Sequence, residues 1–290
     1  MPYCPNCGSE VSEADRFCSE CGASLREKKG DLVTEELDIP FPEADNPLLE
    51  LVVAVAGNIT AGPGDDKLLE GTINYDVPEW KPEITQTENR VTVKQRSSVT
   101  WQAFESPIND WEITIGKAKP FRLRVKTGVM RGEWELGGLP LTGLDVETGV
   151  SQNKLGFSEP NPETVNMVSI QTGVGETRLT GLLNARFREM RVGGGVGEVR
   201  LGFTGAELKE DANVRMEGGV GGFDITVDKD TRALFQVSGL THVNALGKIY
   251  KVKGGFGRSE YVNDAYDDKE GPILEFNITL GLGGITLRTT

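Results

Sequence analysis

From residue 48 onward, apolar and polar residues alternate in short runs, and this pattern predicts a chain built mostly of β-strands. Leu49, Leu51 and Val53 alternate with less apolar neighbours, and Val91 and Val93 repeat the theme. Such an alternating run places one face of a strand in a core and the other in solvent. We find no run with the 3.6-residue period of an amphipathic helix.

The alternation becomes a repeat at Phe121. Each unit has a strand-like run, a glycine-rich corner around a valine, and a second strand-like run. A period of roughly 20–25 residues is typical of stacked arrays. Glycines supply positive φ at a corner, and we expect the valine between them to point into the core. The corner valines recur at nearly even spacing along the chain: Val129, Val150, Val174, Val196 and Val220.

These patterns predict a β-solenoid or stacked β-sandwich of about 22–24-residue repeats over residues 121–290. Residues 48–120 are strand-rich but atypical of the repeat, so we expect them to cap its N-terminal end. The chain finishes in an alternating run, Ile285–Thr290. Because open strand edges invite pairing with another chain, we expect any homo-oligomer to form through this C-terminal strand.

The four cysteines all lie near the N-terminus, as two Cys-x-x-Cys pairs: Cys4 with Cys7, and Cys18 with Cys21. Two such pairs form a tetrahedral four-sulfur cage that suits Zn²⁺. The alternative is a pair of disulfides, which a reducing compartment disfavours. Because sulfur fills every ligand position, we expect a structural zinc ribbon over residues 1–25 and no catalytic metal.

Residues 26–47 separate the ribbon from the strands. Six acidic residues lie between Asp31 and Asp45, and prolines interrupt regular structure. One interpretation is an extended arm that docks through Leu37, Ile39 and Phe41. The composition favours the other, a flexible acidic spacer.

The charge limits the partners. A formal net charge of -13 over 290 residues opposes binding to nucleic acid and to anionic lipid headgroups. No apolar run approaches the roughly 18 residues that a membrane span needs, so we expect no direct span. The N-terminus lacks the basic and apolar regions of a signal peptide, which predicts a cytoplasmic protein.

The chemistry for an enzyme is sparse. His242 is the one histidine in the sequence, and strands rather than helices follow the glycine clusters, which excludes a phosphate loop. The acidic groups Asp65–Asp66 and Asp264–Glu270 lack EF-hand spacing and are interpreted as solvated turns. We therefore expect no enzyme. The tryptophans are interpreted as core or cap, with a carbohydrate-lining groove as the alternative: Trp80, Trp101, Trp111 and Trp134.

Units such as Gly173–Leu179 and Gly195–Leu201 share the pattern Gly-Val-Gly-Glu-x-x-Leu. They resemble bacterial toast-rack domains, including the C-terminal region of LiaF-like cell-wall-stress proteins. The upstream segments Val55–Gly62 and Val77–Pro82 resemble the part that precedes such repeats, and the segment with the four cysteines resembles a bacterial zinc ribbon. The resemblance implies an assembly platform linked to envelope stress, with any membrane role supplied by a membrane-associated partner.

Together, these features predict a non-enzymatic scaffold. We expect its zinc ribbon to dock a protein partner and its rigid β-repeat body to act as an assembly platform. The alternative function is a glycan-binding or glycan-active β-solenoid protein, which the tryptophans and acidic residues motivate.

Overall fold

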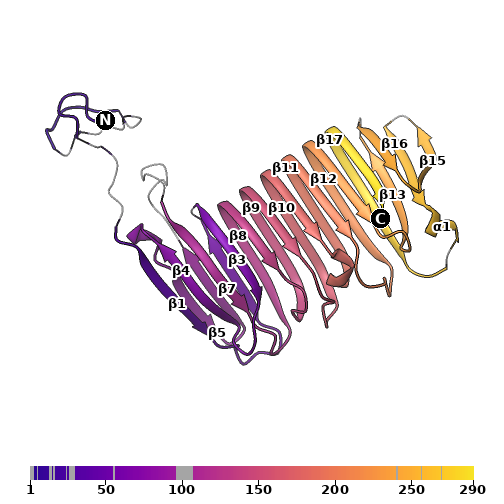
Figure 1. Ribbon diagram of the computed structural model, residues 1–290, viewed down its shortest axis with the longest axis horizontal. Helices are drawn as coiled ribbons and strands as arrows, with labels where there is room; N and C mark the ends of the chain where they lie inside the picture. The colour runs from indigo at the N-terminus through magenta and orange to yellow at the C-terminus, as the bar shows by residue number, and fades with distance from the viewer. Residues whose placement is uncertain are drawn as a thin grey trace.

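The computed structural model describes residues 3–4, 6–12, 15, 17–23, 25, 30–54, 56–95, 107–239, 241–255, 257–268 and 270–290. Trp101 and Val55 lie outside this part of the chain. The described residues form a mostly β protein with a small N-terminal ribbon and an elongated β body (Figure 1). The predicted mostly β class with an N-terminal zinc ribbon is thereby confirmed.

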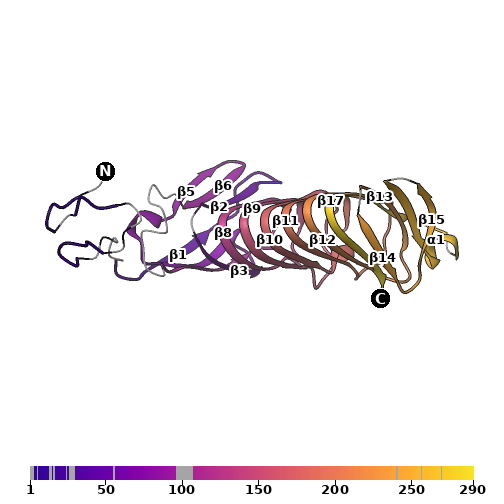
Figure 2. The same cartoon turned by 90° about the horizontal axis from the view of Figure 1, so that it is seen from above.

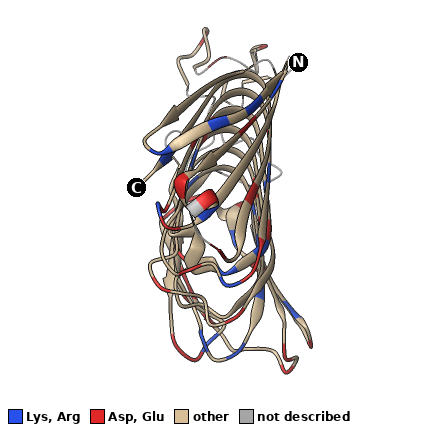
Figure 3. Ribbon diagram, turned by 90° about the vertical axis from the view of Figure 1, so that its right-hand side faces the viewer, with Lys and Arg blue, Asp and Glu red and all other residues tan. Residues whose placement is uncertain are grey.

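Long parallel strands form the middle of the body, side by side and in register. Each long strand turns at its glycine-rich corner, so that its two halves lie in two different layers. The first layer holds the first halves, where β2 pairs with β8. The second layer holds the second halves, where β3 pairs with β8. Figure 3 shows the strands surrounding an elongated interior. These strands are β8 (Phe121–Glu135), β9 (Leu141–Gly156), β10 (Val165–Thr180), β11 (Phe187–Phe203), β12 (Ala212–Val227) and β17 (Ile273–Thr289).

At the N-terminal end, shorter strands continue both layers. In the first layer the order outward from β8 is β2 (Leu48–Val53), β6 (Arg90–Gln95) and β5 (Glu83–Thr87). In the second it is β3 (Gly57–Pro63), β7 (Asn109–Ile115), β4 (Leu69–Tyr75) and β1 (Val33–Ile39). The short helices η1 (Pro78–Trp80) and η3 (Leu182–Ala185) lie between strands.

At the other end, β17 has neighbours on both sides. β13 (Arg232–Ser238) and β14 (His242–Leu246) pair with its two halves. β16 (Arg258–Asn263) runs antiparallel to β13, β15 (Ile249–Gly255) runs antiparallel to β16, and α1 is Asp264–Asp268. Because β17 also pairs with β12, the prediction of an open edge at the C-terminal strand is wrong.

Part of the predicted spacer is a strand. Val33–Ile39 pairs with β4 along its whole length, and its Leu37 and Ile39 are buried. Phe41 packs edge-on against Phe121, with ring centroids 6.2 Å apart. The spacer interpretation is therefore wrong for this segment. Apolar and acidic residues alternate with period two in this segment, and this pattern is typical of a strand with one solvated face.

The corner valines point outward, and the expectation that they enter the core is wrong. Their exposed fractions run from 37% at Val129 to 52% at Val196. The glycine after the valine has a φ of 139° to 145° in β10, β11 and β12. A Cβ on Gly197 would lie 1.8 Å from the carbonyl oxygen of Gly175. Because the backbones meet so closely inside the corner, side-chain volume fits only outside it.

Candidate metal centre

Two turns of matching geometry present the four cysteines. The amide of Gly8 donates to the carbonyl of Cys4 at 2.8 Å, and the amide of Gly22 donates to the carbonyl of Cys18 at 2.9 Å. Both glycines lie in the left-handed region, with φ of 77° and 69°. A residue with a Cβ adopts this region at a cost, so each turn depends on its glycine.

The four sulfur atoms form one cluster. Cys4 Sγ lies 3.7 Å from Cys21 Sγ, and Cys7 Sγ lies 3.6 Å from Cys18 Sγ. All four lie within 4.8 Å of one another. With zinc–sulfur bonds of about 2.3 Å, a tetrahedral site has sulfur–sulfur edges of about 3.8 Å. The predicted ligands therefore fit a structural Zn²⁺ ion, and four sulfurs leave no coordination position for water or substrate.

The thiols differ in acidity because their hydrogen bonds differ. Hydrogen bonds with the hydroxyl and the backbone amide of Ser9 lower the pKa of Cys7 to about 6. The side-chain amide of Asn6 lowers the pKa of Cys21. A backbone hydrogen bond at Cys21 favours the thiolate of Cys18, but burial and the neighbouring thiols outweigh it and raise the pKa of Cys18 to about 11. Because zinc binds thiolates, zinc binding releases the protons that the four thiols still carry.

Two exposed aromatic side chains accompany the metal centre. Tyr3 and Phe17 each come directly before the first cysteine of a pair, and they are 67% and 64% exposed. Neither residue was singled out from the sequence, where the available signal was the recurrence of aromatic-Cys-x-x-Cys in both turns. The ribbon therefore combines a closed metal site with two exposed aromatic side chains.

The remaining sequence-predicted positions do not join this centre. Trp80, Trp111 and Trp134 are buried in the core, so none of these three lines an exposed groove. His242 is exposed at the start of β14. Within the described residues, the four cysteines are the one group of His, Cys, Asp and Glu side chains with a metal-binding arrangement.

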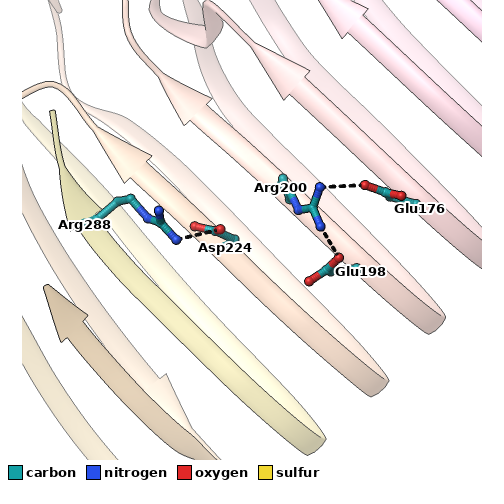
Figure 4. A network of polar contacts seen from close by, with 5 residues as sticks. All are labelled: Glu176, Glu198, Arg200, Asp224 and Arg288. Atoms are coloured by element: carbon teal, nitrogen blue, oxygen red, sulfur yellow. Dashed lines mark hydrogen bonds and ion pairs between the residues drawn. The ribbon is translucent and has the colours of Figure 1, made fainter.

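Ion pairs between neighbouring strands cover the outside of the second layer (Figure 4). Arg200 on β11 pairs with Glu176 on β10 at 2.8 Å and with Glu198 on its own strand at 2.5 Å. Arg288 on β17 pairs with Asp224 on β12 at 2.8 Å. Surface pairs of this kind contribute about 0–1 kcal/mol each, so we interpret them as fixing strand register rather than as catalytic groups.

A depression of about 750 Å³ lies on the first layer beside the corners of β9 to β12. Its charged lining includes Glu147, Arg191, Arg215 and Glu217, and four glycines also line it. Arg215 already pairs with Glu217 at 2.8 Å. Within the described residues, no helix is both long and apolar enough to cross a membrane.

Residues 28–180 match the family described as the N-terminal domain of toast_rack, DUF2154, and residues 3–25 match the zinc-ribbon domain. None of the curated proteins matches the chain. A "putative cell adhesion protein" from Clostridium sporogenes ATCC 15579 has 19% identity and a TM-score of 0.49, over 90% of this chain and 100% of that one. A "putative adhesin" from Bacteroides fragilis NCTC 9343 has 12% identity and a TM-score of 0.33, over 90% and 97%. These similarities carry no functional conclusion.

Proposed function

Because the chain belongs to the toast_rack N-terminal domain family and carries a zinc ribbon before that domain, we propose that it is a non-enzymatic scaffold. In this proposal the ribbon docks a protein partner, and the body, a β-solenoid with repeats of about 22–24 residues, is a rigid assembly platform. The proposal places the scaffold in the bacterial cytoplasm, in the response to envelope stress, with contact to the membrane through a membrane-associated partner.

The observation that carries the proposal is the exposed aromatic pair on the ribbon, Tyr3 and Phe17. A module this small holds its shape through the metal, since it has too few residues for a core of its own. Exposed aromatic side chains on such a module are good anchors for a protein partner, because each buries a large apolar area at little entropic cost. The closed metal site supports docking rather than catalysis.

A second surface supports the platform role of the body. We define the valine ridge as the outward side chains at the corners of the long strands. Neighbours on the ridge lie opposite each other in register, so they repeat at about 4.8 Å along the body. The glycines before them leave the ridge without lateral cover, and contiguous apolar surface of this kind marks contact sites. The ridge consists of Val129, Val150, Val174, Val196, Val220 and Leu282.

The test compares capture of binding proteins by the zinc-loaded full chain and by the double variant Tyr3→Ser/Phe17→Ser. We expect the variant to keep its zinc and its molar mass. The amount of partner that it captures should fall at least tenfold. Lys209→Ser, at an exposed residue of the body outside the edge strands, is the control and should capture normally. Light scattering and capture with residues 1–30 removed complete the comparison. Unchanged capture by the zinc-loaded double variant would exclude docking through the ribbon aromatics.

A further inference from the structure

The β body ends in strand edges, one for each layer at each end. In the first layer, β5 pairs only with β6 and β15 pairs only with β16 among the described strands. In the second layer, β1 pairs only with β4 and β14 only with β17. Figures 1 and 2 place β1 and β5 at one end of the elongated body and β14 and β15 at the other. Such edges carry backbone groups available to another chain.

The directions of the edge strands allow β15 of one copy to pair with β5 of another, and β14 with β1. β15 is antiparallel to β16, which is antiparallel to β13, so β15 runs in the direction of the long strands. β5 runs against them, since it is antiparallel to β6. A second copy placed end to end would therefore bring β15 against β5 in an antiparallel pair. It would also bring β14 against β1 in a parallel pair, and both pairings form regular ladders.

Exposed apolar side chains gather at the same two ends. Outside the ribbon and the valine ridge, the large apolar residues that are exposed in the described body fall into two groups. Leu32, Val33, Ile84 and Ile108 lie in or beside the strands of the N-terminal end, and Leu246, Tyr250 and Val252 belong to β14 and β15. Pairing of unlike ends would cover both groups, and contacts of this kind favour association.

Charge selects unlike ends over like ends. β5 and its following turn carry Glu83 and Glu88, with Lys94 of β6 opposite Glu83, and β15 carries Lys251 and Lys253, with Glu260 of β16 opposite Lys253. Two copies of one edge repel, and β5 and β15 attract.

The helix α1, red in Figure 3, adds acidic groups at the β15 end. Its Asp264 is held by Lys248 at 2.8 Å, and Asp267 belongs to the same helix. The charge argument concerns the edge strands alone, where the lysines of β15 would meet the acidic residues of β5. We propose that this protein associates head to tail with a second copy of itself, through the β14–β15 edge of one copy and the β1–β5 edge of the next. Contacts of this heterologous kind extend into open linear assemblies. The inference rests on the proposed platform function and names its partner.

The test measures weight-average molar mass against concentration for the full zinc-loaded chain by light scattering. We expect the mass to rise from the 31.5 kDa of one chain to at least twofold that value. Lys251→Glu/Lys253→Glu makes both edges acidic, and Glu83→Lys/Glu88→Lys makes both basic. Each variant alone should remain at 31.5 kDa, and an equimolar mixture should recover the twofold rise.

Lys209→Glu/Lys229→Glu changes the charge equally at exposed loop residues outside β1, β5, β14 and β15, and should assemble normally. A wild-type chain that stays at 31.5 kDa at every concentration would overturn the inference. So would edge variants that assemble alone, or a mixture that does not assemble. Capture of a partner by the ribbon is measured separately, so failure of head-to-tail assembly is distinguishable from failure of the docking function.

Discussion

Arg288 Nη2 lies 2.8 Å from Asp224 Oδ2, although the two residues are 64 positions apart (Figure 4). The pair joins the last strand of the chain directly to β12. Strands β13 to β16 therefore lie beyond β17, and the C-terminal residues belong to the interior of the sheet rather than to its edge.

Deleting residues 284–290 should destabilise the body strongly. The deletion removes Ile285 and Leu287, which are fully buried, and the pairing partner of β14. Removing one buried aliphatic side chain costs about 2–5 kcal/mol, so we expect a loss of at least about 4 kcal/mol in the free energy of unfolding. Urea denaturation measures it. Deleting Thr290 alone, which is exposed, should cost less than about 1 kcal/mol. A truncated chain of wild-type stability would contradict the internal position of β17.

The corner glycines predict a sharp contrast between two alanine variants. Gly197→Ala places a Cβ against the backbone of Gly175 at a positive φ, and we expect it to lose about 2–4 kcal/mol or fail to fold. In Gly222→Ala the nearest atom lies 3.6 Å away, an ordinary contact, so stability should change by less than about 1 kcal/mol. Thermal unfolding compares them, and equal midpoints would contradict the close approach of the strands.

Polar substitution of two valines on the same strand should change the free energy of unfolding by different amounts. Val196 belongs to the valine ridge, and Val196→Ser should leave stability within about 0.5 kcal/mol of wild type. Val192 is 2% exposed, and Val192→Ser should cost at least about 2 kcal/mol. The measurement is urea denaturation. A large loss in Val196→Ser would show that the ridge is part of the core after all.

Removing a zinc ligand should affect the ribbon and leave the body folded. Substitution of a residue that only hydrogen-bonds to a metal ligand weakens metal binding by about 10–100-fold. Loss of a ligand itself should cost more, so Cys4→Ser should lose at least about 100-fold in zinc affinity. Metal analysis should find one zinc per wild-type chain and none in the variant, while the main thermal transition of the body stays in place. Ser19→Ala, beside the ligand Cys18, is the control that should retain zinc.

Acid should remove the contribution of the ion pair between Glu133 and Lys154. Lys154 Nζ lies 2.8 Å from Glu133 Oε1, and its hydrogen bond lowers the pKa of Glu133. Because the folded pKa lies below the unfolded one, the contribution is present above the unfolded pKa and is lost as pH falls through the folded pKa. Lys154→Gln should therefore be slightly less stable than wild type at pH 7. The difference should vanish in acid, and a difference independent of pH would exclude the pair as its source.

The zinc centre could be predicted almost completely from the sequence, because its information is local. Two residues between the cysteines of a pair and a glycine after the second define each turn, whatever the rest of the chain does. The exposure of Tyr3 and Phe17 could not be predicted from the sequence, because exposure is a property of the folded surface. An aromatic residue beside a cysteine is equally compatible with burial.

By itself, the sequence determined the mostly β class, the glycine-rich corners and the four cysteines of the metal centre. Alternation and glycine positions act through the local backbone, which is why these predictions held. Only the tertiary structure decided that the corner valines point outward, that Val33–Ile39 joins the sheet and that β17 lies between β12 and β13. Each of these depends on the space left by strands distant in the chain. The periodicity of the sequence does not specify which strands pair with each other in the sheet.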